Sequence, residues 1–108
     1  MIGKIVKVIV DRPLGTYHPN HKDIFYTVNY GYIPQLFALD GEEQDAYILG
    51  VNEPVEEFLG EVIAIIHRKN DVEDKLVVAP KGVTFTEKEI MSLVSFQERF
   101  FDTEIIMK

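Results

Sequence analysis

The 108-residue chain contains no cysteine. This absence excludes disulfides, a thiolate nucleophile and a zinc site built on thiolates, and it is typical of proteins from reducing compartments. The sequence also has no apolar run long enough to cross a membrane, and its N-terminus lacks the apolar core of a secretory signal. We therefore expect a cytoplasmic protein without a membrane segment.

Basic residues are absent from a long central stretch, because no Lys or Arg lies between Lys22 and Arg68. Half of the 18 acidic residues fall in that stretch, and the formal net charge is −7. Such a charge disfavours binding to nucleic acid or to an anionic membrane. Neither G-x-G-x-x-G nor G-x-x-x-x-G-K-[ST] occurs, so the sequence also lacks a glycine-rich phosphate loop.

The hydrophobic pattern predicts one domain over residues 1–108 that is mainly β with some α. Short β-branched and aromatic runs predict strands at 4–11, 24–33, 45–51, 61–68 and 75–80, and residues 103–108 could add an edge strand. From Thr86 the spacing becomes helical, and Thr86 with Glu89 has the form of a capping box. The last aromatic residues, Phe96, Phe100 and Phe101, are interpreted as core-facing helix positions. We expect a small five- to six-stranded OB-like β-barrel covered by one C-terminal amphipathic helix.

Two acidic groups stand beside predicted strands. Asp40, Glu42 and Asp45 precede one strand, and Asp71, Glu73 and Asp74 precede another. Oxygen ligands of this kind suit a hard cation such as Mg²⁺, which would relieve the repulsion among them. On spacing alone, a solvated hairpin turn is the favoured explanation of the first group, because acidic residues are common in turns. If strand ends met at one barrel rim, both groups could hold ions and a bridging water, as metal-assisted phosphoryl hydrolysis requires.

The segment "YTVNYGYIPQLFALDGEEQDAYILG", followed by "EDKLVVAP", resembles the soluble inorganic pyrophosphatases, as a short and divergent member. The family pattern has a tyrosine, then N-Y-G-Y-I, D-G-D-x-x-D and D-x-K-L-V-x-x-P. The resemblance implies that Asp40, Asp45, Glu73 and Asp11 are metal ligands. It also implies that Glu42 orients or deprotonates the attacking water, and that Tyr26, Tyr30 and Lys75 belong to the substrate pocket.

Several positions depart from the family pattern. Arg68 falls where the family has an aspartate, and Phe100 and Phe101 replace a Tyr-Lys pair. Arg68 could instead bind substrate phosphate, or it could be a solvated strand end. His18 and His21 are interpreted as polar loop residues, since no third nitrogen or sulfur ligand is apparent.

The resemblance implies hydrolysis of inorganic pyrophosphate to two phosphates by a metal-activated water, with Mg²⁺ or Mn²⁺ as cofactor. Two alternatives remain open. The protein could hydrolyse another small phosphoanhydride or phosphoester, or it could be a non-catalytic metal-phosphate binding protein of the same fold. The expected partner is pyrophosphate or a similar small phosphate, without nucleic acid or membrane, and a homo-oligomer is not excluded.

Overall fold

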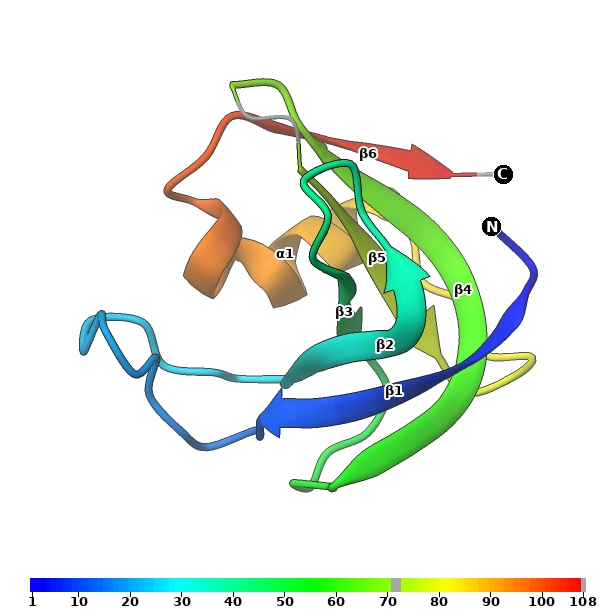
Figure 1. Ribbon diagram of the computed structural model, residues 1–108, viewed down its shortest axis with the longest axis horizontal. Coiled ribbons are helices and arrows are strands. Elements are labelled where there is room, and N and C mark those ends of the chain that lie inside the picture. Colours follow the sequence, from blue (N-terminus) through cyan, green and yellow to red (C-terminus); the bar gives the residue numbers. More distant parts are fainter. Residues whose placement is uncertain (71–72, 108) are drawn as a thin grey trace.

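The computed structural model describes residues 1–70 and 73–107, which form six strands and one helix (Figure 1). In chain order these are β1 (Ile5–Arg12), β2 (Asn29–Phe37), β3 (Glu43–Ile48), β4 (Glu57–Arg68), β5 (Asp74–Ala79), α1 (Glu87–Glu98) and β6 (Thr103–Met107). Asp71, a member of the second acidic group, lies outside the described residues. Over the described ranges, no helix is long and apolar enough to cross a membrane.

The sheet closes into a five-stranded barrel in the order β1-β2-β3-β5-β4, because β4 pairs back onto β1. The β3–β5 pair is parallel and the others are antiparallel. The first half of β4 pairs with β1, and β6 pairs with the second half on the same edge. The predicted OB-like barrel with one helix is confirmed, and the described part of the last predicted segment, Thr103–Met107, does supply an edge strand.

Closure brings β1 and β2 very close at Gly31. A Cβ atom built there would lie 1.9 Å from the carbonyl oxygen of Ile9. Only glycine fits such an approach of one backbone to another. The glycine within "NYGYI" is therefore a requirement of the barrel wall itself.

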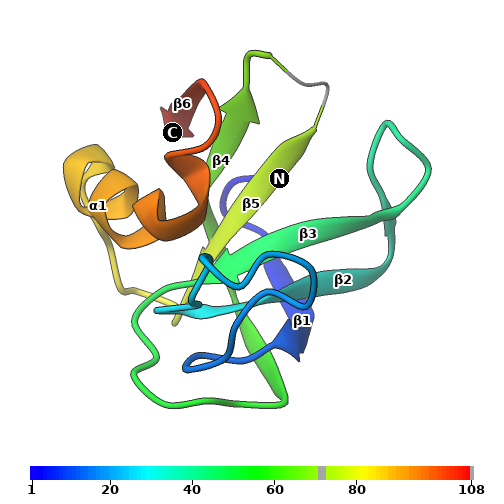
Figure 2. The same cartoon turned by 90° about the vertical axis from the view of Figure 1, so that its left-hand side faces the viewer.

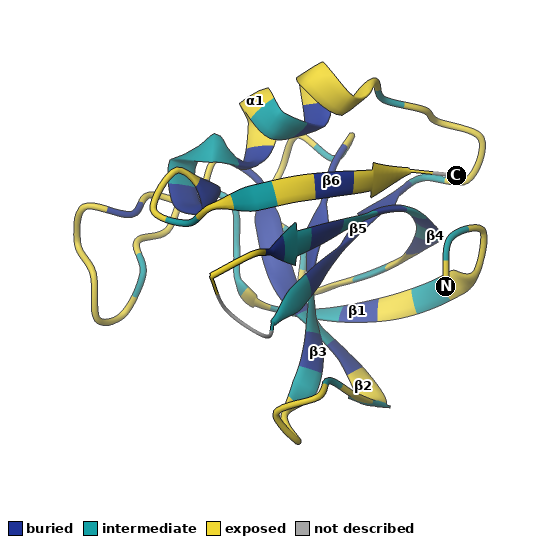
Figure 3. Ribbon diagram, turned by 90° about the horizontal axis from the view of Figure 1, so that it is seen from above, coloured by how far each residue is buried: buried dark blue, intermediate teal, exposed yellow. Residues whose placement is uncertain are grey.

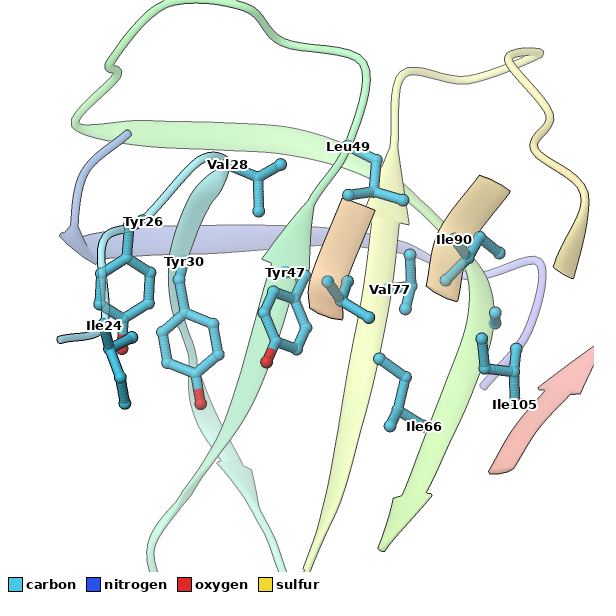
Figure 4. Packing of buried hydrophobic residues seen from close by; sticks show 12 residues of the cluster. Ile24, Tyr26, Val28, Tyr30, Tyr47, Leu49, Ile66, Val77, Ile90 and Ile105 are labelled. Carbon is cyan, nitrogen blue, oxygen red and sulfur yellow. The ribbon is translucent and has the colours of Figure 1, made fainter. Parts of the chain in front are cut away.

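Two apolar layers stabilise this arrangement. One fills the barrel with residues from all five of its strands: Val8, Ile33, Ala46, Ile48, Val62, Leu76 and Val78. The other lies between the barrel wall and α1, where Ile90 and Val94 of the helix meet Tyr47, Ile66 and Val77 (Figure 4). The outer side of α1 is exposed (Figure 3), as the amphipathic pattern predicts.

Two β-bulges decide which side chains reach the helix-covered side. In β4 the register shifts between Val62 and Ala64, so Val62 faces the barrel interior whereas Ala64 and Ile66 pack in the layer under α1. Arg68 continues this second set to the end of the strand. In β1 the register shifts between Val10 and Arg12, which leaves Asp11 as the extra residue.

Some predicted boundaries were wrong. Residues 24–28, predicted as the start of a strand, form an irregular segment before β2, and a Tyr17–Phe25 bridge joins this segment to the loop after β1. Strand β4 begins at Glu57, earlier than the predicted start at residue 61. The helix ends at Glu98, and its last turn tightens as Phe100 and Phe101 donate backbone hydrogen bonds to Gln97 and Glu98. Phe100 is consequently 49% exposed, so its assignment to the core was also wrong.

Candidate functional site

Two neighbouring hollows lie at one end of the helix-covered layer. The larger, about 440 Å³, is bounded by the loop after β1, the first halves of β2, β3 and β5, the end of β4, and the turn after α1. Figure 2 shows that loop and the C-terminal end of α1 on the same side of the barrel. The smaller hollow, about 130 Å³, lies between the β2–β3 turn and the start of β5. Asp45 and Lys75 line both hollows and form the wall between them.

The smaller hollow, which we call the acidic hollow, is lined by six carboxylates and one cation. The carboxylates are Asp40, Glu42, Glu43, Asp45, Glu73 and Asp74, and the cation is Lys75. The structure therefore brings four predicted site residues, Asp40, Glu42, Asp45 and Glu73, to one place from two separate segments. The segment 38–43 is also an exposed hairpin turn, in which Gly41 adopts φ +86° and Asp40 accepts a hydrogen bond from the Glu42 amide. The segment is thus a solvated hairpin turn, and its carboxylates also share a hollow with those of Glu73 and Asp74 from the second acidic group.

Lys75 is the centre of the wall between the hollows. Its ammonium nitrogen lies 2.8 Å from Asp45 Oδ2 and 2.9 Å from Glu73 Oε2. The Tyr30 hydroxyl donates to the same Asp45 oxygen at 2.8 Å. Lys75 and Tyr30 are buried, whereas the side chains of Asp45 and Glu73 remain 36% and 31% exposed. The two acids are thus held by buried donors and still reach solvent.

Arg68 extends this network toward the helix. Its guanidinium donates to both carboxylate oxygens of Glu98, at 3.0 and 2.7 Å, and its third nitrogen lies 3.5 Å from Glu73. The ring of Phe101 stacks on it at 3.6 Å. Burial lowers the pKa of Arg68, but the hydrogen bonds and negative charge of Glu98 outweigh it and hold the pKa above its ordinary value, so the cation is permanent. The solvated strand end proposed as an alternative for Arg68 is excluded by this burial.

Three tyrosines stand side by side under the cavity, with their hydroxyls pointing the same way (Figure 4). Tyr26 donates to Gln97 Oε1 at 2.6 Å, Gln97 donates to the Tyr47 hydroxyl at 2.7 Å, and Tyr47 donates to Glu98 at 2.5 Å. Burial, and then the adjacent carboxylate, raise the pKa of Tyr30 and of Tyr47 well above the ordinary value. Both hydroxyls therefore remain hydrogen-bond donors at neutral pH.

Two predicted site residues lie away from the cavity surface. Tyr26 is fully buried and its hydroxyl accepts a hydrogen bond from Arg12 at 2.9 Å, so it supports the wall without lining it. Asp11, the bulge residue of β1, is exposed and lines neither hollow. Its neighbour Arg12 lines the larger cavity instead, with its guanidinium 5.9 Å from the ring centres of Tyr26 and Tyr30.

Sequence reasoning missed Arg12, Gln97 and Glu98. Arg12 follows Asp11 directly, and only the bulge decides which of the two faces the cavity. Glu98 would have been expected on a solvated helix surface, since Glu is almost never fully buried unless paired. No local sequence signal pairs Glu98 with Arg68, because their contact joins the last turn of α1 to the end of β4. His18 and His21 do lie in the loop, as expected, and they line the larger cavity.

The fold was compared with known proteins. No protein-family model matches the sequence, and no curated protein matches it significantly. Among solved structures, the chain superimposes on an inorganic pyrophosphatase from Ehrlichia chaffeensis with a TM-score of 0.73 and 16% identity, over 96% of this chain and 85% of that one. An inorganic pyrophosphatase from Neisseria gonorrhoeae superimposes with a TM-score of 0.67 and 20% identity, over 87% of this chain and 72% of that one. An inorganic pyrophosphatase from Thermus thermophilus superimposes with a TM-score of 0.66 and 16% identity, over 94% of this chain and 79% of that one.

The chain has the inorganic pyrophosphatase fold. At these identities the superpositions establish the fold alone.

Mg²⁺, which the family resemblance implies, can be tested against the acidic hollow. Magnesium is usually held by one or two carboxylates, with water and substrate phosphate completing its shell. Asp45 and Glu73 provide two partly exposed carboxylates on one hollow, and Asp40 and Glu42 provide two more at its exposed side. Across residues 1–70 and 73–107, no three acidic or histidine side chains converge closely enough to form a closed metal site. The donors fit an open cation site, which Asp45 and Glu73 would hold, rather than a closed one.

Proposed function

We propose that the protein hydrolyses a phosphoanhydride bond with the help of Mg²⁺ or Mn²⁺, with inorganic pyrophosphate as the simplest substrate and two phosphates as products. The observation that carries this proposal is the shared wall of Asp45 and Lys75 between an acidic hollow and a larger cavity that contains Arg12 and Arg68. A metal ion and a phosphate group need opposite charges around them. The two hollows supply those charges next to each other.

The charge balance of the network supports a metal requirement. Asp45, Glu73 and Glu98 contribute three negative charges against the two positive charges of Lys75 and Arg68. An anion that approaches the wall alone therefore meets a net negative network. When bound, a divalent ion would reverse this sign, neutralise charge on the phosphates and lower the pKa of a water molecule.

The chain's own residues would then perform the remaining steps. Glu42, at the exposed side of the acidic hollow, would accept a proton from the attacking water as the new P–O bond forms. The bond from that phosphorus to the bridging oxygen breaks, and the leaving phosphate takes the electron pair. Lys75 and Arg12 would stabilise the negative charge that develops there, while Tyr30 holds Asp45 in place.

A second candidate is a non-catalytic phosphate-binding protein. The pairing of Lys75 with two carboxylates and of Arg68 with Glu98 favours it, because these cations already have partners. Such a protein would bind methylenediphosphonate, a non-hydrolysable diphosphate, but would release no phosphate from any anhydride.

The test is phosphate release from pyrophosphate and from ADP by the purified protein in Mg²⁺, in Mn²⁺ and in chelator. We expect release that stops with chelator and returns with metal. Asp45→Asn should abolish the activity, whereas Glu87→Gln, an exposed change in the first turn of α1, should not alter it. Absence of release from both compounds in every metal would overturn the proposal.

A further inference from the structure

The larger cavity is bigger than a bare diphosphate requires. Its volume of about 440 Å³ lies within the range of roughly 300–1,000 Å³ that is usual for sites of small organic ligands. Its lining includes three cations that suit phosphate, Arg12, Arg68 and Lys75, together with the carboxylates of Asp23 and Asp45. Another part of the lining has a different chemistry.

Three side chains of the lining are apolar. Ile24 contributes to it from the loop before β2, and Phe100 and Phe101 contribute from the turn after α1. Phe101 is covered on one side by the Arg68 guanidinium. The Arg99 guanidinium lies 5.0 Å from the centre of the Phe100 ring, which remains 49% exposed. A bare diphosphate has no apolar surface to place against a phenylalanine ring. A ligand with an organic group would bury that ring.

The loop across the cavity mouth adds two imidazoles to this surface. The rings of His18 and His21 lie 4.8 Å apart, and both line the cavity. Burial lowers the pKa of His18, and the neighbouring Arg12 and His21 lower it further, so its ring is uncharged at neutral pH. Uncharged imidazole and phenylalanine rings both favour stacking against another flat ring.

We propose that the substrate of this site is an organic diphosphate, whose phosphates lie against Arg12 and Lys75 and whose flat ring packs against Phe100 beside His18. The proposal rests on the proposed function, because it names the substrate class of that same site. It goes further by stating that the organic group, and not only the anhydride, is recognised.

Binding of two non-hydrolysable ligands tests the proposal independently of turnover. Methylenediphosphonate represents the bare diphosphate, and α,β-methylene-ADP carries the same two phosphorus groups on an adenosine. In calorimetric titrations with Mg²⁺ present, we expect α,β-methylene-ADP to bind at least about tenfold more tightly. Phe100→Ala should remove most of that advantage and leave the affinity for methylenediphosphonate unchanged, whereas Phe100→Tyr should retain it.

Leu59→Ala is the matched control, because Leu59 is an exposed apolar side chain on β4 that does not line the cavity. Equal affinities for the two ligands, an advantage that survives Phe100→Ala, or no binding of α,β-methylene-ADP would each overturn the proposal. Hydrolysis of pyrophosphate together with equal affinities would leave the proposed function standing and this inference refuted. Tight, Phe100-dependent binding of α,β-methylene-ADP without hydrolysis of any anhydride would support this inference and refute the proposed function.

Discussion

Lys75 shows at the level of one residue how the site balances two demands. A buried ammonium is costly unless it is paired, and Asp45 and Glu73 provide that pairing. The same pairing keeps two carboxylates close together on the acidic hollow without mutual repulsion. Lys75 therefore stabilises the carboxylate pair that a divalent ion would need, while it remains available at the cavity wall.

In the proposed mechanism, proton transfer from the attacking water depends on Glu42. We expect Glu42→Gln to lower kcat for phosphate release by roughly 10²–10⁴-fold, the usual contribution of a positioned general base, with little change in KM. Steady-state kinetics with saturating Mg²⁺ measures both constants, and Glu87→Gln serves as the control. A kcat within about twofold of the unmodified protein would show that Glu42 takes no part in proton transfer.

At the level of elements, α1 positions side chains of the site through contacts made by its last turn. Its last turn supplies Glu98, which is almost fully buried and binds Arg68 through two hydrogen bonds. Gln97 in the same turn joins Tyr26 to Tyr47. The helix thus covers the apolar layer and also sets the position of one cavity cation.

Removing Glu98 should therefore affect the whole molecule. Glu98→Leu leaves the buried Arg68 without its bidentate partner, and we expect the free energy of unfolding to fall by about 3–5 kcal/mol. Chemical denaturation of the single variant and of an Arg68→Met/Glu98→Leu double variant measures this. The double variant should recover much of the loss, because no unpaired charge remains. Equal losses in the single and double variants would argue against a charge-pairing role.

The other end of α1 carries a capping box, as the sequence predicted. The Thr86 amide donates to Glu89 Oε1 at 2.8 Å, and the Glu89 amide donates to the Thr86 hydroxyl at 3.1 Å. The hydrogen bond from the Thr86 backbone lowers the pKa of Glu89. A lowered carboxyl pKa means that this stabilisation is present above the ordinary value of 4.5 and disappears as pH falls through the lowered pKa.

We therefore expect Glu89→Gln to reduce the melting temperature near pH 7 and the difference from the unmodified protein to shrink as the pH falls from about 5 toward 3. Thermal melts across this range provide the measurement. The nearby variant Lys88→Gln, outside the capping box, should show no such trend. A difference that stays constant with pH would mean that the Glu89 charge contributes nothing to the cap.

At the level of the whole molecule, barrel closure depends on the contact between β1 and β2 at Gly31. We expect Gly31→Ala to lower the free energy of unfolding by at least about 3 kcal/mol, because the added methyl group meets backbone that cannot move without opening the barrel. Gly82→Ala is the matched control, since Gly82 has φ +84° but open space around it, and it should cost about 1–2 kcal/mol. Denaturant titration compares the two, and similar losses would contradict the role assigned to Gly31.

The sequence predicted the elements better than the side-chain pairing. Periodicity and turn residues placed five strands, the helix and its cap, because these depend on local patterns. The bulges at Asp11 and before Ala64 were not predictable, since they arise from how strands meet, and they decide that Arg12 faces the cavity. The convergence of Asp40, Asp45 and Glu73 followed from strand ends sharing one rim. The pairing of Asp45 with Lys75 required the structure, because it depends on the parallel contact of β3 with β5.

The most direct test of the account is a crystal structure determined with Mn²⁺ and methylenediphosphonate, with anomalous scattering used to locate the metal. We predict a manganese peak in the acidic hollow, coordinated by Asp45 and Glu73, with the phosphonate groups against Lys75 and Arg12. Absence of manganese from that hollow, with Lys75 still bridging both carboxylates beside a bound diphosphonate, would contradict the metal-dependent mechanism.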